Sequence, residues 1–339
     1  MEDVRVLSRI VTIDDITPAD NADRLEIAIV GGWRVVVAKG QFHAGDRAVF
    51  AEVDALIPAD NPAFGFSDGM VSQAKTVDGK KYVRIRTIRL RGNLSQGILF
   101  PLGNFPQLEG VADGEDISDI LGILKYEPVD NSEAHIAGEF DQSVARKSDS
   151  ERVQNLTTIF DSLRDDYQWV ATEKLDGQSI TIAKTDGKLR IFTRNKEVDV
   201  EGHKLFQVHP REFFERIIPE GWALQGELIG EGIQSNKLKV RGLDYRIFSV
   251  FADGNEVPLE TWHQVEELFS MAVPTLDINL SDFQDADALI QHVDGLESAY
   301  CPGVLAEGVV FHQVDGKTIP RLGRSTFKVI SNAFLCKFD

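Results

Sequence analysis

The stretch Glu173-Lys174-Leu175-Asp176-Gly177 places a lysine and a carboxylate two residues apart at the end of a predicted strand. A spacing of two puts both side chains on one face of that strand. Gly177 then allows a sharp turn or a close approach of the backbone. A lysine attacks only as the free amine, so its usual pKa of about 10.4 must be lowered by a nearby cation, such as a metal ion or another lysine. The stretch therefore predicts a lysine that acts as a nucleophile.

A plain turn after a strand is the competing interpretation of this stretch. A K-x-D-G match arises by chance in roughly one chain in ten of this length and average composition. A second copy is present at Lys184-Thr185-Asp186-Gly187, between two predicted strands, where it is typical of a hairpin turn. The first copy therefore needs support from the rest of the chain.

Around the first copy, predicted strands alternate with predicted helices. Strands are expected at residues 167–173, 179–183, 189–194, 222–229, 245–251, 305–311 and 326–330. Helices are expected at residues 150–163, 212–217, 260–269 and 286–293, several of them with apolar residues at helical spacing. Strands grouped between helices, with several predicted hairpins, indicate an α+β domain with mostly antiparallel sheets.

The first part of the chain differs, because it consists of short predicted strands separated by Gly and Asp turns. These strands are expected at residues 4–13, 25–30, 33–37, 47–53 and 82–90, the last with a bulge near Thr87. They predict a small antiparallel barrel of about five strands. Residues 125–150 are polar and acidic, which indicates a domain boundary. The expected organisation is a barrel at residues 1–125, a linker at 126–145 and the α+β domain at 146–339.

The overall composition excludes several classes of protein. The chain has 339 residues, of which 42% are hydrophobic and 27% charged, as in globular proteins with a packed core. No apolar run approaches the roughly 20 residues of a membrane span, and the acidic N-terminus lacks the pattern of a signal peptide. Two cysteines cannot form a disulfide framework, so a cytoplasmic location is expected.

The charge is distributed unevenly along the chain. The net charge of −18 argues by itself against a nucleic-acid partner. However, seven basic residues lie between Lys75 and Arg91, with Asp78 as the only acidic residue among them. Such a segment predicts a surface that follows a phosphate backbone, and its candidate contacts are Arg84, Arg86, Arg89 and Arg91. The alternative is a solvated face of an ordinary strand.

Further short motifs follow the lysine in a fixed order. They are Thr193-Arg194-Asn195, Gln225-Gly226-Glu227-Leu228-Ile229, Phe248-Ser249-Val250-Phe251, Glu307-Gly308-Val309-Val310 and Phe327-Lys328-Val329-Ile330. Together with the first K-x-D-G copy, this order resembles the covalent nucleotidyltransferases, which include polynucleotide ligases and mRNA capping enzymes. The resemblance covers about the last 190 residues.

This resemblance implies a chemistry for each matched residue. Lys174 would attack the α-phosphate of ATP and form lysyl–AMP, while Phe248 would stack on the adenine. Asp176, Glu307 and Glu227 would hold Mg²⁺ or Mn²⁺, which prefer oxygen ligands. The implied catalytic residues are Lys174, Asp176, Arg194, Glu227, Glu307 and Lys328. The implied nucleotide-binding residues are Glu173, Leu175, Arg152, Arg194, Glu227, Phe248 and Lys328.

Three longer segments resemble one particular group within this superfamily. Arg152-Val153-Gln154-Asn155 resembles a segment typical of RNA ligases, and residues 90–97 and 327–332 resemble nick-sealing RNA ligases of the Deinococcus and Naegleria type. In that group an OB-like barrel precedes the catalytic domain. The resemblance implies an ATP-dependent RNA ligase that seals 3′-OH and 5′-phosphate ends in RNA or an RNA-containing nicked duplex. We also expect a monomer, and, since no apolar run is long enough to span a bilayer, no membrane partner.

Two alternatives remain at this point: an ATP-dependent DNA ligase, and a non-catalytic OB-type nucleic-acid-binding protein with a decayed transferase domain. DNA ligases and capping enzymes place their OB domain after the last motif. Only 11 residues follow Lys328, which is too few for a barrel. The chain departs from the pattern at Ile330, where many ligases carry a second lysine, and Lys337 is a candidate substitute.

Overall fold

The computed structural model describes residues 5–127, 135–320 and 322–338. The described chain forms two compact units. The first holds the residues up to Glu127 together with Leu335–Lys337, and the second holds the residues from His135 to Phe334 together with Phe338. No helix in these described ranges is long and apolar enough to cross a membrane.

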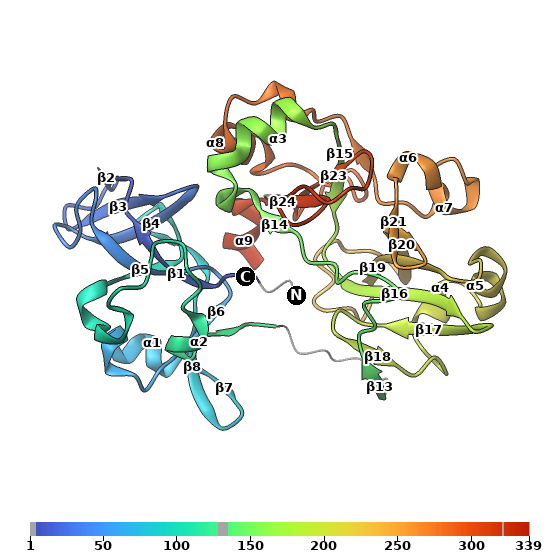
Figure 1. Ribbon diagram of the computed structural model, residues 1–339, viewed down its shortest axis with the longest axis horizontal. Coiled ribbons are helices and arrows are strands. Elements are labelled where there is room, and N and C mark those ends of the chain that lie inside the picture. The colour runs from blue at the N-terminus through green and yellow to red at the C-terminus, as the bar shows by residue number, and fades with distance from the viewer. Residues whose placement is uncertain (1–4, 128–134, 321, 339) are drawn as a thin grey trace. The chain divides into compact units, whose positions relative to one another are not determined.

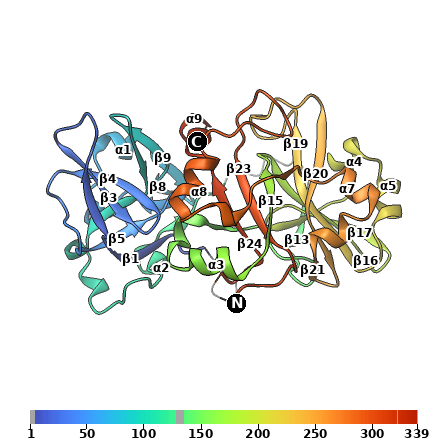
Figure 2. The same ribbon diagram turned by 90° about the horizontal axis from the view of Figure 1, so that it is seen from above.

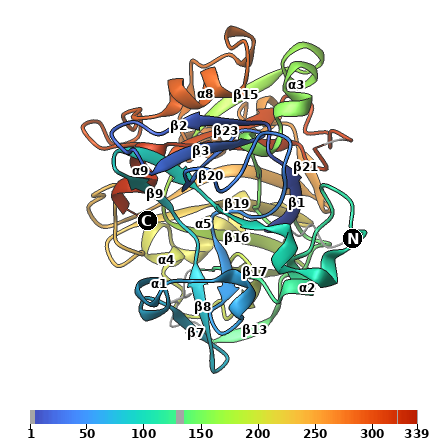
Figure 3. The ribbon, with the colours of Figure 1, turned by 90° about the vertical axis from the view of Figure 1, so that its left-hand side faces the viewer.

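The first unit consists of short strands and turns (Figure 3). Its strands are β1 Ser8–Thr12, β2 Asp15–Pro18, β3 Leu25–Val30, β4 Trp33–Ala38, β5 Arg47–Ala51, β6 Ala55–Pro58, β7 Lys75–Val77, β8 Lys80–Arg84, β9 Thr87–Leu90, β10 Asn93–Gln96, β11 Ile98–Pro101 and β12 Leu124–Lys125. Its short helices are α1 Asp68–Ser72 and α2 Ser118–Leu121. The strands pair in the orders β1-β5-β11, β2-β3-β4, β10-β9 and β12-β6-β8-β7. Two neighbouring cores, one around Trp33 and Phe50 and one around Ile57 and Phe100, fill the unit.

The basic segment of this unit is not the single strand that the sequence predicted. β8 ends at Arg84, where its pairing with β6 stops, and β9 begins at Thr87 to form a hairpin with β10. The hairpin turn uses Arg91 and Gly92 with φ of 52° and 90°, which is the left-handed conformation of a tight hairpin. The expected bulge is therefore a strand break.

The second unit contains the longer strands and most of the helices (Figure 1). Its strands are β13 Ile136–Glu139, β14 Glu151–Arg152, β15 Trp169–Lys174, β16 Gln178–Thr185, β17 Lys188–Phe192, β18 Lys196–Val198, β19 Trp222–Gly230, β20 Leu243–Ala252, β21 Asn255–Val257, β22 Thr275–Leu276, β23 Gly308–Gln313 and β24 Thr326–Ile330. Its helices are α3 Phe160–Asp166, α4 Leu205–Val208, α5 Arg211–Ile217, α6 Leu259–Trp262, α7 Glu266–Ser270 and α8 Ala286–Val293, and α9 Asn332–Phe338 ends the described chain.

Two sheets organise this second unit. One has the strand order β13-β18-β17-β16-β19-β20-β21, and the other has the order β14-β24-β23-β15-β22. The pairing is antiparallel except between β14 and β24. Helices α3 and α8 cover one face of the second sheet (Figures 1 and 2), where Phe160 and Leu289 pack with Phe311 and Phe327. The α+β class with antiparallel sheets is confirmed.

The predicted helix at residues 150–163 is wrong for most of its length. Residues 151–152 form β14, two short 3-10 turns follow, and the α-helix begins only at Phe160. Val153, Leu156 and Phe160 are nevertheless buried in one core. Their spacing resembles that of a helix because successive tight turns also bring every third or fourth residue to the same side.

The described part of the predicted linker also carries structure, while residues 128–134 lie outside the described chain. β13 pairs with β18. Phe140, Val144 and Ala145 are buried and pack in one cluster with Phe192 and Phe251. The residues from Ile136 onward therefore belong to the fold of the second unit.

Candidate active site

The lysine of the first K-x-D-G copy ends β15, and its ladder partner on β23 is Gly308. Lys174 Nζ donates a hydrogen bond to Glu307 Oε2 at 2.7 Å. A Cβ atom on Gly308 would lie 2.1 Å from the carbonyl oxygen of Val329, so β23 can approach β24 here only with a glycine. This close packing of the strands places Glu307 beside the lysine.

The charges around Lys174 determine its protonation. Burial by itself would lower the pKa of Lys174, but the carboxylates of Glu307, Glu227 and Asp176 outweigh burial and raise its pKa. The lysine is therefore held as an ammonium ion. Additional positive charge at these carboxylates is needed to release the free amine.

Glu227 on β19 is the third carboxylate of this cluster. Burial, with help from Glu307 and Asp176, raises the pKa of Glu227 to about 8, although Lys174 and Arg194 act in the opposite direction. Burial likewise raises the pKa of Glu307. Carboxylates that repel one another in a partly dry site favour the binding of a cation.

Gly177 connects the lysine motif to β19. A Cβ atom at this position would lie 2.4 Å from the carbonyl oxygen of Leu228. The glycine is thus required for a close approach of two backbone segments, which is one of the two reasons that the sequence suggested. This approach brings Asp176 toward the strand that carries Glu227.

The loop at residues 231–242, between β19 and β20, contributes contacts that the sequence did not predict. Lys237 Nζ donates to Asp176 Oδ1 at 2.9 Å, and Gln234 Nε2 donates to the carbonyl oxygen of Gly177. The available signal was a lysine in a loop bounded by Gly230 and Gly242, directly after the Glu227 strand. A lysine in a polar loop is too common to have indicated a contact with Asp176.

Phe248 lies at an irregularity of the sheet. Gln225 pairs with Ser249 and Gly226 pairs with Ile247, which leaves Phe248 as the extra residue of a β-bulge. A bulge redirects the side chain that it contains. Phe248 is half-buried against the cluster that includes Leu175. An aromatic ring in this position is suitable for stacking on a flat ligand.

Lys328 and Arg152 follow on the same sheet as the nucleophile. Lys328 is opposite Val310 on one side and Arg152 on the other. Residues that pair directly share a face of the sheet, and Val310 is two residues from the partner of Lys174. Lys328 and Lys174 therefore face the same side. Ile330 is buried in β24, and Lys337 is exposed on α9.

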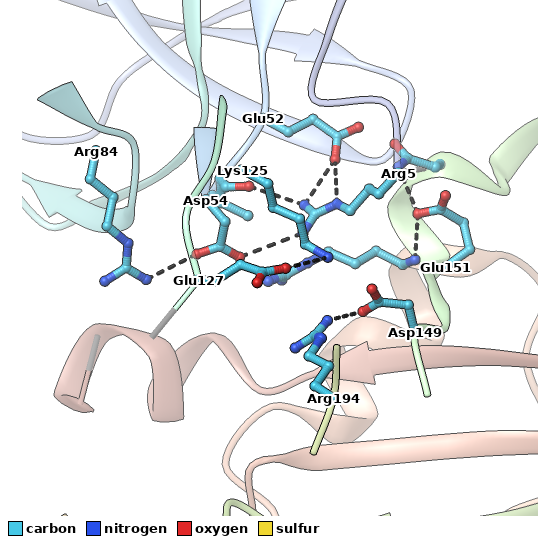
Figure 4. A network of polar contacts seen from close by, with 12 residues as sticks. Arg5, Glu52, Asp54, Arg84, Lys125, Glu127, Asp149, Glu151 and Arg194 are labelled. Atoms are coloured by element: carbon cyan, nitrogen blue, oxygen red, sulfur yellow. Dashed lines mark hydrogen bonds and ion pairs between the residues drawn. The ribbon is translucent and has the colours of Figure 1, made fainter. Parts of the chain in front are cut away.

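Two of the expected nucleotide-binding side chains have other partners. Glu173 is only 2% exposed and lies on the opposite face of β15 from Lys174, where it accepts a hydrogen bond from the backbone N–H of Tyr300 at 2.8 Å. Arg194 forms an ion pair with Asp149 (Figure 4). The structure therefore joins Lys174, Asp176, Glu227 and Glu307 in one cluster, but it does not bring the Glu173 carboxylate to it.

The second K-x-D-G copy is a hairpin turn, as the sequence indicated. Asp186 and Gly187 connect β16 to β17 with φ of 52° and 70°. Lys184 Nζ donates to the carbonyl oxygen of Glu215 at 2.8 Å.

The carboxylates do not form a closed metal cage. Among the described residues, no group of three His, Cys, Asp or Glu side chains is arranged to hold a metal ion directly. Asp176 Oδ2 is buried without a hydrogen-bond partner, while Oδ1 faces Lys237. An orphaned carboxylate oxygen beside Glu307 and Glu227 fits a divalent cation that keeps several of its water ligands.

The four arginines of the basic segment do not have equivalent surroundings. Arg84 donates to Asp54 at 2.9 Å and lies 3.7 Å from the ring centre of Tyr126, and Asp54 is also paired with Arg5 (Figure 4). The side chain of Arg84 is 16% exposed. Arg86, Arg89 and Arg91 are exposed, so they are the better candidates for phosphate contacts.

Comparison with known proteins agrees with this architecture. A family model described as RNA ligase matches residues 167–330, and one described as OB-fold domain matches residues 7–102. No match was found among curated protein sequences. The chain is 34% identical to a structure of Naegleria gruberi RNA ligase with PPi, with 99% of each chain covered and a TM-score of 0.85. A mutant of that ligase with AMP and Mn has the same identity and TM-score, with 98% and 99% covered. An apo mutant has a TM-score of 0.86 at 34% identity, with 99% and 98% covered. The chain belongs to the RNA ligase family, with an OB-fold domain ahead of its ligase domain.

Proposed function

We propose that this protein is an ATP-dependent RNA ligase that joins a 3′-OH end to a 5′-phosphate end. The observation that carries the proposal is the pairing of Lys174 with Glu307, beside Asp176 and Glu227, in a chain of this family. A lysine surrounded by three carboxylates is suited to form a phosphoramide once a cation balances their charge.

The reaction has three steps. The amine of Lys174 attacks the α-phosphorus of ATP, a P–N bond forms, and the bond to pyrophosphate breaks. An oxygen of the RNA 5′-phosphate then attacks the AMP phosphorus, and the P–N bond breaks. Finally the 3′-OH attacks the activated 5′-phosphorus, and AMP leaves. Each step exchanges one bond to phosphorus for another and needs no oxidant or reductant.

The other residues of the cluster would bind and orient ATP. Asp176, Glu227 and Glu307 would hold Mg²⁺ or Mn²⁺, whose charge would stabilise the free amine of Lys174 and offset that of the phosphates. Lys328, on the same face, would stabilise the charge that builds at the α-phosphate. Phe248, redirected by its bulge, would stack on the adenine. Structures of mutants of the Naegleria ligase contain ATP and Mn, which supports this choice of ligands.

Arg152 and Arg194 are the remaining candidates for this site. Arg152 faces Lys328 across β14 and β24, which supports a contact with a phosphate of ATP. Arg194 acts electrostatically on Glu227, which supports a position near the ribose or the acceptor strand. For Glu173 we retain only its backbone as a candidate contact, because its carboxylate lies on the other face of β15.

The OB-fold domain would bind the RNA. Its exposed arginines Arg86, Arg89 and Arg91 suit phosphate contacts, and an OB fold is a common platform for nucleic acid. An RNA-containing nicked duplex is the substrate that we favour, with the protein acting as a monomer. A DNA ligase would use the same first step, so matched nicks with a ribose or a deoxyribose at the 3′ end separate the two activities.

The first step can be tested directly. The protein is incubated with ATP labelled at the α-phosphate and with Mg²⁺ or Mn²⁺, and is then resolved by denaturing electrophoresis. We expect label on the wild-type protein and on Lys184→Ala, the matched control, and no label on Lys174→Ala. Lys174→Arg should also fail, since a guanidinium does not deprotonate. Label retained by Lys174→Ala would contradict the assignment of the nucleophile.

A further inference from the structure

Lys237 forms an ion pair with the carboxylate next to the nucleophile. Its Nζ lies 2.9 Å from Asp176 Oδ1, and the two side chains are only 18% and 10% exposed. Asp176 Oδ2 is buried and has no hydrogen-bond partner. Lys237 therefore places a positive charge in direct contact with this carboxylate.

The loop that carries Lys237 contacts the lysine motif at three successive positions. Leu238 packs with Leu175, Lys237 pairs with Asp176, and Gln234 donates to the carbonyl oxygen of Gly177. Such matched contacts fix the loop against the motif.

The backbone of this loop is also unusual. Gln234, Asn236 and Lys239 have φ of 44°, 45° and 57°, a region that non-glycine residues rarely occupy. The Lys237 ammonium lies 5.1 Å from the ring centre of Phe334, which gives it a second favourable contact. The loop backbone and the ring of Phe334 therefore hold the Lys237 ammonium at Asp176, whereas a freely moving surface lysine would sample many positions.

A divalent cation at Asp176 must compete with this ammonium. Lys237 Nζ holds Oδ1 of Asp176, the unpartnered Oδ2 is the oxygen left for the cation, and two positive charges on one carboxylate repel each other. Lys237 also compensates the charge of Asp176 when no cation is bound, and this contact holds the partly buried side chain in place.

We propose that Lys237 is a positioning residue that holds Asp176 when no divalent cation is bound, opposes the charge of an incoming cation, and thereby sets the metal affinity of the site. This inference rests on the proposed function, because it takes Asp176 as part of the metal site. Lys237 is not assigned a contact with the reacting atoms. Its effect is exerted through Asp176.

The test measures binding of Mn²⁺ alone to the full chain, without ATP, from the electron paramagnetic resonance signal of free Mn²⁺. Lys237→Met and Lys237→Gln are each expected to lower the Kd for Mn²⁺ by roughly tenfold, the factor that one charge-assisted hydrogen bond contributes. Lys237→Arg keeps the charge and should remain close to the wild-type value. Lys239→Met, an exposed lysine of the same loop, is the matched control and should leave the Kd unchanged.

The outcomes separate the inference from the proposed function. Asp176→Asn gives the background of non-specific binding to this acidic chain. If Asp176→Asn binds Mn²⁺ as the wild type does, the proposed metal site is wrong. If Asp176→Asn loses binding while Lys237→Met and Lys237→Gln both keep the wild-type Kd or bind more weakly, the metal site stands and the role of Lys237 is overturned. Thermal unfolding of each variant without metal verifies that it is folded.

Discussion

Lys174 Nζ donates to Glu307 Oε2 at 2.7 Å, so the proposed nucleophile is bound by a carboxylate that would also hold the metal ion. The same contact has two consequences. It positions the lysine, and it keeps the lysine protonated until positive charge reaches the carboxylate. A cation at Glu307 would therefore position the substrate and release the nucleophile at the same time.

The first prediction concerns the charge of these carboxylates. Glu307→Gln and Asp176→Asn keep the size of each side chain and remove its negative charge. We expect each to slow lysyl–AMP formation by more than about tenfold, since tenfold is about 1.4 kcal/mol and a charge-assisted hydrogen bond contributes at least that. Rates are measured across a Mn²⁺ titration, where excess metal should restore part of the activity. Glu260→Gln, an exposed carboxylate on α6, is the control. Wild-type rates in both variants at every metal concentration would refute the metal site.

The second prediction separates the arginines of the basic segment. Arg84→Ala removes the partner of Asp54 and a stacked contact with Tyr126. It should lower the free energy of unfolding of the first unit by roughly 1–3 kcal/mol. Arg86→Ala and Arg89→Ala should leave that stability unchanged, because both side chains are exposed.

RNA binding is the second measurement on this segment, and here the exposed arginines are the ones expected to show a defect. Arg86→Ala and Arg89→Ala should weaken binding to a nicked RNA duplex and reduce its salt dependence. A variant that makes fewer phosphate contacts releases fewer counterions when it binds. Urea unfolding and binding at several salt concentrations measure the two effects. If the wild type and a variant with both Arg86→Ala and Arg89→Ala show equal salt dependence, these residues do not contact phosphates and form an ordinary solvated surface.

The sequence was most informative where local pattern and chemistry coincide. β24 and α8 begin and end at the predicted residues, and the second K-x-D-G copy forms the predicted hairpin. The ordered motifs indicated Lys174, Asp176, Glu227 and Glu307, which the fold brings into one cluster. Each of these features depends on a few neighbouring residues or on a fixed order of motifs.

Features that depend on distant contacts could not be predicted. Lys237 reaches Asp176 across 61 positions of the chain, and no local pattern connects them. Arg84 and Arg86 looked equivalent on one face of a strand, but the strand ends at Arg84. The alternation that predicted a common face holds only within an unbroken strand.

The third prediction concerns the pH dependence of stability. His312 on β23 is buried beside Thr172, with 3.1 Å between Nε2 and Oγ1, and burial, with a smaller effect of His263, lowers the pKa of His312 to about 4. The unfolded chain binds this proton below about pH 6.5, whereas the folded chain stays neutral down to about pH 4. Stability should therefore fall as the pH drops between these values, by at most about 3 kcal/mol from this residue. Urea unfolding at pH 7.5 and pH 5 measures the loss.

His312→Asn should reduce this pH dependence, although it lowers stability at both values. The control is His135→Asn, because His135 is exposed in the same unit and should leave the dependence intact. An unchanged difference between the two pH values in His312→Asn would show that another group titrates.

The last prediction is that the two units have separable functions. Every residue expected to react with ATP lies in the second unit. A fragment that begins at His135 should form lysyl–AMP but seal a nicked RNA duplex poorly, because it lacks the arginines of the OB-fold domain. A fragment that begins at Arg146 also loses β13 and the buried side chains of Phe140 and Val144, so it should be less stable by roughly 4 kcal/mol. The measurement compares sealing by the full chain and by the longer fragment, each adenylylated beforehand to the same extent, so that a defect in the first step cannot contribute. Equal sealing rates would mean that the OB-fold domain does not hold the RNA, and the substrate contacts would then have to lie in the ligase domain itself.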